Sequence, residues 1–203
     1  MSPVFVEHPT PWIGVPESWP YNDWQTVDEW ADELVESLRE HFDHEEEGQS
    51  EVLRGLLITV AESRVRRNVS RVYIGIENWT GPVTIADLTV VDFAPDESMS
   101  LEHFAGVDDP DAVEKPIVDE FVTSSGLQGL ESIRYLNPHD LSRLVARLDF
   151  VFPTPTGVVH LYTAHLDLVA FERARPQLEA LARSISIADS YEDLLASLEE
   201  TNA

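Results

Sequence analysis

The chain has 203 residues, with 38 acidic side chains against 13 basic ones, a formal charge of −25 and no cysteine. The missing thiols exclude disulfide frameworks, thiolate zinc sites and cysteine nucleophiles. The excess of carboxylates repels phosphate backbones, so we do not expect nucleic-acid binding. Three origins of the acidity stay open: a coding bias, since Lys115 is the only lysine; adaptation to salt; and mimicry of nucleic acid or docking to a basic partner.

Length and hydropathy predict a single domain, residues 1–203, that does not enter a membrane. A chain of this size buries enough surface to fold without a disulfide or a metal ion. It has no apolar run of about 18 residues, and its first residues lack the basic start and apolar stretch of a secretory signal. We therefore expect a cytoplasmic protein.

Proline and aromatic residues crowd the first part of the chain, and we predict an extended segment over residues 1–22. Trp12 and Trp19 belong to this segment, and Trp24 follows it. Aromatic side chains in such segments are more often packed onto a core than exposed. The alternative is that the three tryptophans form a docking surface for a partner.

An acidic helical arm is predicted over residues 23–67. Apolar residues recur at three- and four-residue spacing over 27–42, which is typical of an amphipathic helix. Thr26 followed by Glu29 fits a capping box. A second amphipathic helix is predicted to begin at Ser50, and its last turn is rich in arginine, which suits a helix C-terminus.

Alternation of apolar and polar residues predicts a core over residues 69–187. Consecutive strands without crossover helices indicate an antiparallel sheet, so the fold class is α+β, with about five to seven strands covered by helices. One segment, 117–123, is predicted to be helical instead. The predicted strands are 69–77, 82–93, 130–136, 144–152 and 158–167.

The clearest pattern in the core is a hairpin followed by a helix. A loop of about five residues is predicted over 153–157, because two prolines and a glycine interrupt the alternation there. Asp167 is predicted to cap the following helix, and Pro176 to divide it. A last short helix is predicted over 190–201.

Four residues of the hairpin are candidate ligand-binding residues: Arg143, Arg147, His165 and Asp167. An arginine pair on one strand face can hold a carboxylate or a phosphate, and a His–Asp pair can orient an imidazole for proton transfer. The alternative is that the arginines pair across strands, Asp167 caps the helix and the nearby His160 packs in the core.

His41 and His44 are candidate metal ligands, because two histidines at this spacing, with carboxylates around them, can face one cation. Known zincin motifs use a different spacing, with a glutamate between the histidines. We favour a solvated helix end and expect neither a metal nor a cofactor. No glycine-rich phosphate loop and no nucleophile-elbow serine is present, so no catalytic residue is assigned.

A resemblance to a known family rests on the C-terminal hairpin and helix. The residues concerned are the strand VVHLYTAHLDL, then Phe171, Arg175-Pro176 and Leu178, and the closing run from Leu181 to Ile185. They resemble the PsbP-like α/β/α sandwich, including its LpqN-type actinobacterial members. The acidic arm and the missing lipoprotein signal depart from that pattern. The resemblance implies a non-catalytic adaptor, assembly factor or chaperone.

These observations lead to two hypotheses. The first, which we favour, is a non-enzymatic cytoplasmic binding protein, an adaptor or a chaperone whose partner is another protein or a second copy of the chain. The second is a small-molecule binding protein or a hydrolase that uses a pocket on the sheet face at the four hairpin residues. A concave pocket with perturbed pKa values at that face would favour the second hypothesis.

Overall fold

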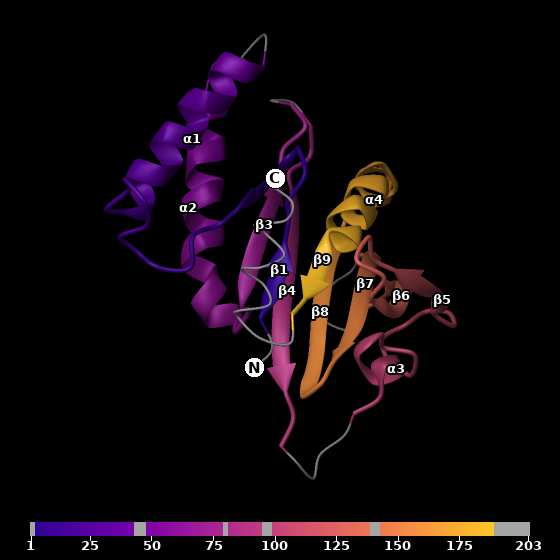
Figure 1. Cartoon of the computed structure of the whole chain (residues 1–203). Coiled ribbons are helices and arrows are strands. Elements are labelled where there is room, and N and C mark those ends of the chain that lie inside the picture. Colours follow the sequence, from indigo (N-terminus) through magenta and orange to yellow (C-terminus); the bar gives the residue numbers. More distant parts are fainter. Residues whose placement is uncertain (1–2, 43–47, 79–80, 95–98, 139–142, 189–203) are drawn as a thin grey trace. The chain divides into compact units, whose positions relative to one another are not determined.

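The computed structural model (Figure 1) describes residues 3–42, 48–78, 81–94, 99–138 and 143–188. Its helices are α1 (Val27–His41), α2 (Gln49–Arg67), α3 (Leu101–Phe104) and α4 (Leu168–Arg183). Its strands are β1 (Val4–Val6), β2 (Trp12–Gly14), β3 (Arg71–Gly75), β4 (Thr84–Asp92), β5 (Ile117–Val122), β6 (Gln128–Leu136), β7 (Val145–Thr154), β8 (Gly157–His165) and β9 (Ile185–Ile187).

The strands form two sheets. β1 pairs with β9, and the other seven strands form an antiparallel sheet in the order β2-β3-β4-β8-β7-β6-β5. The predicted α+β class is therefore confirmed. The chain divides into two compact units: unit 1 comprises Met1–Pro9 and Leu88–Ala203, and unit 2 comprises Thr10–Asp87. No helix in the described parts of the chain has both the length and the apolar character needed to span a membrane.

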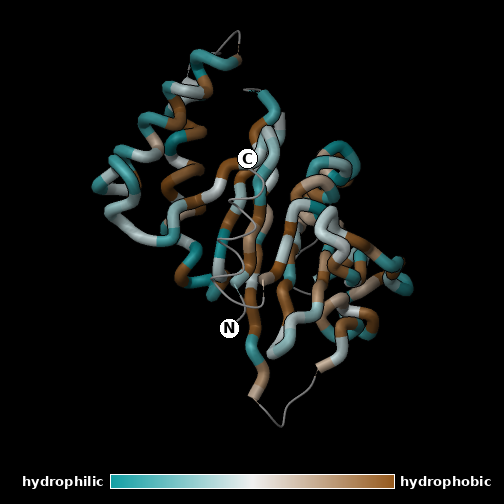
Figure 2. Tube along the Cα trace, in the orientation of Figure 1, coloured by the Kyte–Doolittle hydropathy of each residue, from teal (hydrophilic) through white to brown (hydrophobic). Residues whose placement is uncertain are grey.

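Unit 2 contains the paired helices α1 and α2 together with β2 and β3 (Figure 1). Thr26 caps α1, since its hydroxyl accepts the N–H of Glu29 at 3.2 Å. The Glu29 carboxylate accepts the N–H of Gln25 at 2.6 Å, so the predicted reciprocal cap forms with the preceding residue. Hydrophilic and hydrophobic stretches both occur along α1 (Figure 2), and its buried residues recur at the spacing of one helix face.

Helix α4 covers one face of the sheet in unit 1 (Figure 1). Arg175 of α4 donates a hydrogen bond to Glu131 of β6 at 3.2 Å, and Glu131 is paired with Phe150 of β7. Directly paired residues of antiparallel strands project from the same face, so Phe150 lies on the α4 side. The other face is buried as well, because Asp149 and Val151 are both fully inaccessible to solvent.

The segment 117–123 was predicted as a helix, and this prediction was wrong. Ile117–Val122 forms β5, which pairs with β6 over its whole length, from Ile117 opposite Ile133 to Val122 opposite Gln128. β5 contains three β-branched residues, and pairing with a neighbouring strand overrides the ambiguous local pattern of the segment.

Two features of the predicted hairpin and helix also need correction. The hairpin loop is shorter than expected, because Pro153 pairs with Val158 and Thr154 with Gly157. Pro176 does not divide α4, which is continuous. The buried apolar residues before the exposed proline (Phe171, Ala174) and after it (Leu178, Leu181) lie on the same face of the helix. Burial of this face stabilises the helix across the proline.

Both ends of the described chain contain strands that the alternation did not predict. β1 lies in the segment that was expected to be extended without pairing, and β9 follows α4 directly. The two are paired from Val4 opposite Ile187 to Val6 opposite Ile185. Three-residue strands are too short for a periodic signal. The helix predicted over 190–201 lies outside the described residues.

Candidate functional site

The four predicted ligand residues are not brought together. Arg147 is paired with Ala164 across the hairpin, whereas His165 is paired with Ala146. Arg147 and His165 therefore project from opposite faces of the sheet. The predicted longer loop would have paired Val145 with His165, and a shift of one residue exchanges the two faces of a strand.

The other two members of the predicted group have separate positions. Asp167 caps α4, since its carboxylate accepts the N–H groups of Val169 at 2.8 Å and Ala170 at 3.1 Å. This confirms the alternative role given to Asp167. Arg143 is exposed and precedes β7.

A buried charged group lies on the sheet face to which Arg147 belongs. Asp149 is the centre of the group and has no exposed surface. It accepts hydrogen bonds from Arg134 Nη2 at 2.7 Å and Nε at 3.2 Å, from Arg147 Nε at 2.9 Å and from His160 Nε2 at 2.7 Å. The third guanidinium nitrogen of Arg134, Nη1, donates a hydrogen bond to the carboxylate of Asp109. We call these five residues the Asp149 cluster.

The carboxylate of Asp149 is ionised, and its lone pairs are fully used by hydrogen-bond donors. Burial alone would raise its pKa, but the hydrogen bond from His160 and the charges of Arg147 and Arg134 outweigh burial and hold the pKa below its ordinary value. A carboxylate offers about four lone-pair positions, and four donors occupy them here. Asp149 is therefore not free to take a proton as a general base.

The loop after α3 closes one side of the Asp149 cluster. Gly106 in this loop has φ +65°, and a Cβ on it would collide with the guanidinium of Arg134. Only glycine combines this left-handed backbone with so close an approach. The ring of Phe104 lies 6.2 Å from that of His160, so the cluster adjoins an apolar part of the same face.

The sequence pattern alone does not group Arg134, Asp109 and His160 with Asp149. The alternation along β7 puts Arg147 and Asp149 on one face, but the β6 and β8 residues that join them depend on the register. His160 is buried, as the alternative interpretation predicted. The signal in the sequence is that several neighbouring strands carry charged or polar residues at every second position, so that these residues share a face of their strand. The register between the strands decides which of them become neighbours.

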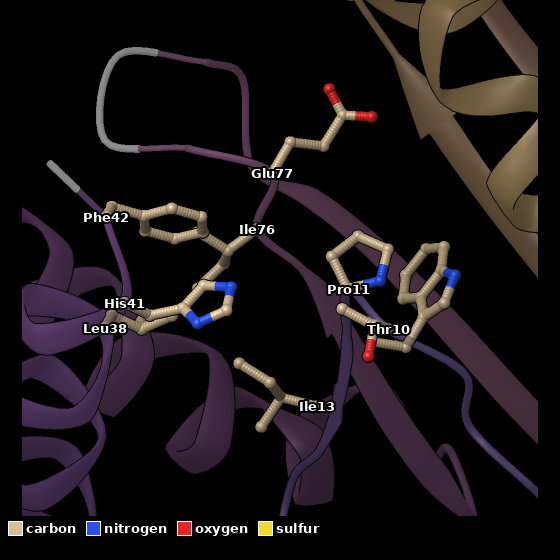
Figure 3. Close-up of a pocket in the computed structure, with 9 residues that line it drawn as sticks. Thr10, Pro11, Ile13, Leu38, His41, Phe42, Ile76 and Glu77 are labelled. Atoms are coloured by element: carbon tan, nitrogen blue, oxygen red, sulfur yellow. The ribbon is translucent and has the colours of Figure 1, made fainter.

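The second candidate site is an apolar pocket within unit 2, with a volume of about 270 Å³ (Figure 3). We call it the Trp12 pocket. Its polar lining residues are Thr10, His41 and Glu77. In Figure 3 the imidazole of His41 faces the same space as Ile13 and Pro11, while the Glu77 carboxylate points away from it. The apolar lining residues are Pro11, Trp12, Ile13, Leu38, Phe42 and Ile76.

Strand pairing between β2 and β3 positions the wall of the Trp12 pocket. Trp12 is paired with Gly75, and a Cβ on Gly75 would lie 3.2 Å from the indole ring. The glycine thus leaves room for a buried tryptophan. The N–H of Ile76 donates to the carbonyl of Pro11 at 3.3 Å, which extends the pairing to two further residues that line the pocket.

The three tryptophans predicted as docking residues differ in their surroundings. Trp12 lines the pocket, whereas the ring of Trp19 packs 5.9 Å from that of Trp30. Trp24 donates its indole N–H to Glu33 at 2.8 Å and stacks on Tyr21. Trp19 and Trp24 are thus engaged in contacts of unit 2, and of the three only Trp12 is among the residues that line the pocket.

The predicted histidine pair is only partly described. His41 lines the Trp12 pocket, and His44 lies outside the described residues. Within the described ranges, no three side chains of the metal-binding types converge on one point. His41 is therefore interpreted as a polar group of the pocket.

Comparison with known proteins does not assign the chain to a family. No protein-family model matches the chain, and no curated protein matches it. The resemblance to the PsbP-like sandwich stays a prediction, and the two sites are interpreted from their geometry.

Proposed function

We propose that the protein is a non-enzymatic binding protein and that the Trp12 pocket takes an apolar anchor side chain from a partner protein. The observation that carries the proposal is an apolar pocket, lined by Trp12 and Phe42, on a strongly acidic unit. The cytoplasmic location expected from the sequence remains part of the proposal.

The size of the pocket favours a side chain over a larger ligand. Its volume of about 270 Å³ falls below the range of about 300–1,000 Å³ that is typical of small-molecule sites. Protein interfaces often concentrate their binding energy in one aromatic or aliphatic anchor that fills such a pocket. The Phe42 ring and the aliphatic side chains of the lining suit an apolar anchor.

The charge of unit 2 specifies the rest of the partner segment. Residues 10–87 contain 16 acidic residues and 6 arginines. Glu40 on the last turn of α1 and Glu77 at the pocket are both exposed. A partner segment with basic residues beside its anchor would complement this surface and associate faster at low ionic strength.

The Asp149 cluster supports a binding role over a hydrolytic one. It contains the histidine and carboxylates that acid–base chemistry would need, but Asp149 is saturated by Arg134, Arg147 and His160. The hydrolase hypothesis also required Arg147 and His165 on one face, and they lie on opposite faces.

The test measures fluorescence anisotropy of a labelled peptide that has one tryptophan at its centre and arginines on both sides. We expect saturable binding that weakens as salt is added. Replacing the peptide tryptophan by serine is expected to weaken binding at least about tenfold, because an anchor contributes about 2 kcal/mol or more. Replacing the arginines by glutamates is expected to weaken it further.

Protein variants locate the binding to the pocket. Ile13→Trp fills the pocket and is expected to abolish peptide binding. The matched control is Val65→Trp, which adds the same side chain at a position on α2 that is 77% exposed. Equal binding by the tryptophan and serine peptides, or undiminished binding by Ile13→Trp, would overturn the proposal.

A further inference from the structure

One edge of the Arg147 guanidinium has no partner in the described part of the chain. Its Nε donates to Asp149 at 2.9 Å, and no acceptor among the described residues faces Nη1 or Nη2. Arg134, by contrast, uses all three of its nitrogens within the Asp149 cluster. The side chain of Arg147 is 26% exposed, against 6% for Arg134, so solvent reaches part of the Arg147 side chain.

The exposed guanidinium is held in place on two sides. Its central carbon lies 4.4 Å from the centroid of the Tyr162 ring, and its Nε is fixed by Asp149. The residue paired with Arg147 across the hairpin is Ala164, which is small and exposed. A ligand can therefore approach the outer edge, and little side-chain freedom is lost when it binds.

We propose that the outer edge of Arg147 binds the carboxylate or phosphate group of a small anionic ligand. The two Nη groups match the spacing of two oxyanion oxygens, which is the geometry of a bidentate pair. Asp149 has no lone pair left for them, because it already receives four donors. This site is separate in residues and in ligand chemistry from the Trp12 pocket, so either proposal stands without the other.

The overall charge makes a positive result informative. A protein with a formal charge of −25 repels small anions at long range, so nonspecific accumulation of benzoate or phosphate is disfavoured. Residues 131–183, which include four of the five cluster residues, contain six acidic residues and six arginines. Saturable binding at Arg147 would thus report short-range recognition.

The experiment follows the side-chain Nε–H signals of the arginines by NMR while sodium benzoate, sodium phosphate or sodium chloride is added to the full chain. We expect the Arg147 signal to shift saturably with benzoate, with phosphate or with both, and not with chloride. The benzoate and phosphate titrations distinguish the two ligand sources. No saturable shift with either anion, or an equal shift with chloride, would overturn the proposal.

Two variants identify the ligand-binding residue. Arg147→Lys keeps a positive charge beside Asp149 but lacks the planar fork, and we expect affinity to fall at least about tenfold, as read from the backbone amide of Ala164. Arg143→Lys, at an exposed position just before β7, is the matched control and is expected to leave the affinity unchanged. Binding that survives in Arg147→Lys, or is lost in Arg143→Lys, contradicts the assignment. If Arg147→Lys fails to fold, the wild-type titrations still decide.

Discussion

The Asp149 cluster and the Trp12 pocket show opposite ways of treating polar and apolar groups. In the cluster, buried ionisable side chains pair with one another, so most of their hydrogen-bond donors and acceptors are already occupied within the protein. In the pocket, apolar side chains surround a space of about 270 Å³ that no described residue fills. An apolar surface or a guanidinium edge that has no partner among the described residues is better evidence of a binding site than a group of charged side chains that already pair with one another.

Two ion pairs, one from each unit, differ in the same way. Arg134 and Asp149 have 6% and 0% of their side-chain surface exposed, whereas Arg54 and Asp28 have 37% and 61% exposed. Solvent screens the exposed pair, and its partners lose little when separated. Breaking the buried pair leaves a charge without water or a counter-ion. The predictions below test whether stability follows this difference in burial.

The largest effect is expected from Asp149→Ala. The change leaves Arg134 buried and pairs it only with Asp109, so we expect the free energy of unfolding to fall by about 3–5 kcal/mol. Urea unfolding measures this loss. Asp28→Ala, which removes an exposed partner of Arg54, is the control and is expected to have a much smaller effect. Equal losses in the two variants would mean that burial does not set the strength of these pairs.

The next largest effect is expected from Gly106→Ala. The added methyl group would collide with the Arg134 guanidinium and would sit on a backbone with φ +65°, so a loss of about 1–3 kcal/mol is expected. Gly126→Ala is the control, because its φ is +83° but no atom lies within 4 Å of a Cβ there. If both variants lose the same stability, the backbone conformation alone accounts for the effect and the close approach to Arg134 does not matter.

Much of the fold follows from local patterns in the sequence. The regular alternation along β7 and β8 predicts two strands, and both form, although their side chains are buried on both faces of the sheet. Thr26 and Asp167 each stand where a helix must satisfy its first N–H groups, and both cap a helix. Such signals depend on a few neighbouring residues, and they can be read without knowledge of the tertiary structure.

The two sites could not be predicted from local patterns, because they depend on which residues pair across strands or meet between distant parts of the sequence. The difference between a five-residue loop and the observed tighter turn decides whether His165 or Ala164 shares a face with Arg147. β5 was misassigned because its partner strand, which stabilises it, lies further along the chain. The Trp12 pocket joins Trp12, Leu38 and Ile76, whose proximity no periodic pattern encodes.

A small effect is expected from Ser132→Ala, although Ser132 is fully buried beside Asp149. Its hydroxyl has no hydrogen-bond partner among the described residues, so its removal costs no bond, and we expect stability to change by less than about 1 kcal/mol. Ser184→Ala is the control, because its hydroxyl donates to Leu181 at 2.7 Å and its removal breaks a bond. A loss of about 2 kcal/mol or more in Ser132→Ala would reveal a bound water or ligand at the cluster.

The smallest effect at neutral pH concerns His165, which the register places on the α4 face. Its Nε2 is buried without a partner among the described residues, and its ring lies 6.1 Å from that of Phe171. Burial lowers the pKa of His165, and the charge of Asp167 offsets this only in part. The unfolded chain therefore binds more protons once the pH falls below the ordinary value of 6.5, and stability declines from there towards the lower folded-state pKa.

Urea unfolding between about pH 8 and about pH 5 tests this expectation in the wild type and in His165→Gln. The variant is expected to show a shallower loss of stability below pH 6.5 and the same slope as the wild type above about pH 7.5. Leu166→Ala, at the exposed neighbouring position, should retain the wild-type slope throughout. If His165→Gln keeps that slope too, Nε2 has a hydrogen-bond partner that stabilises the protonated ring, and the α4 face resembles the Asp149 cluster in satisfying its buried histidine.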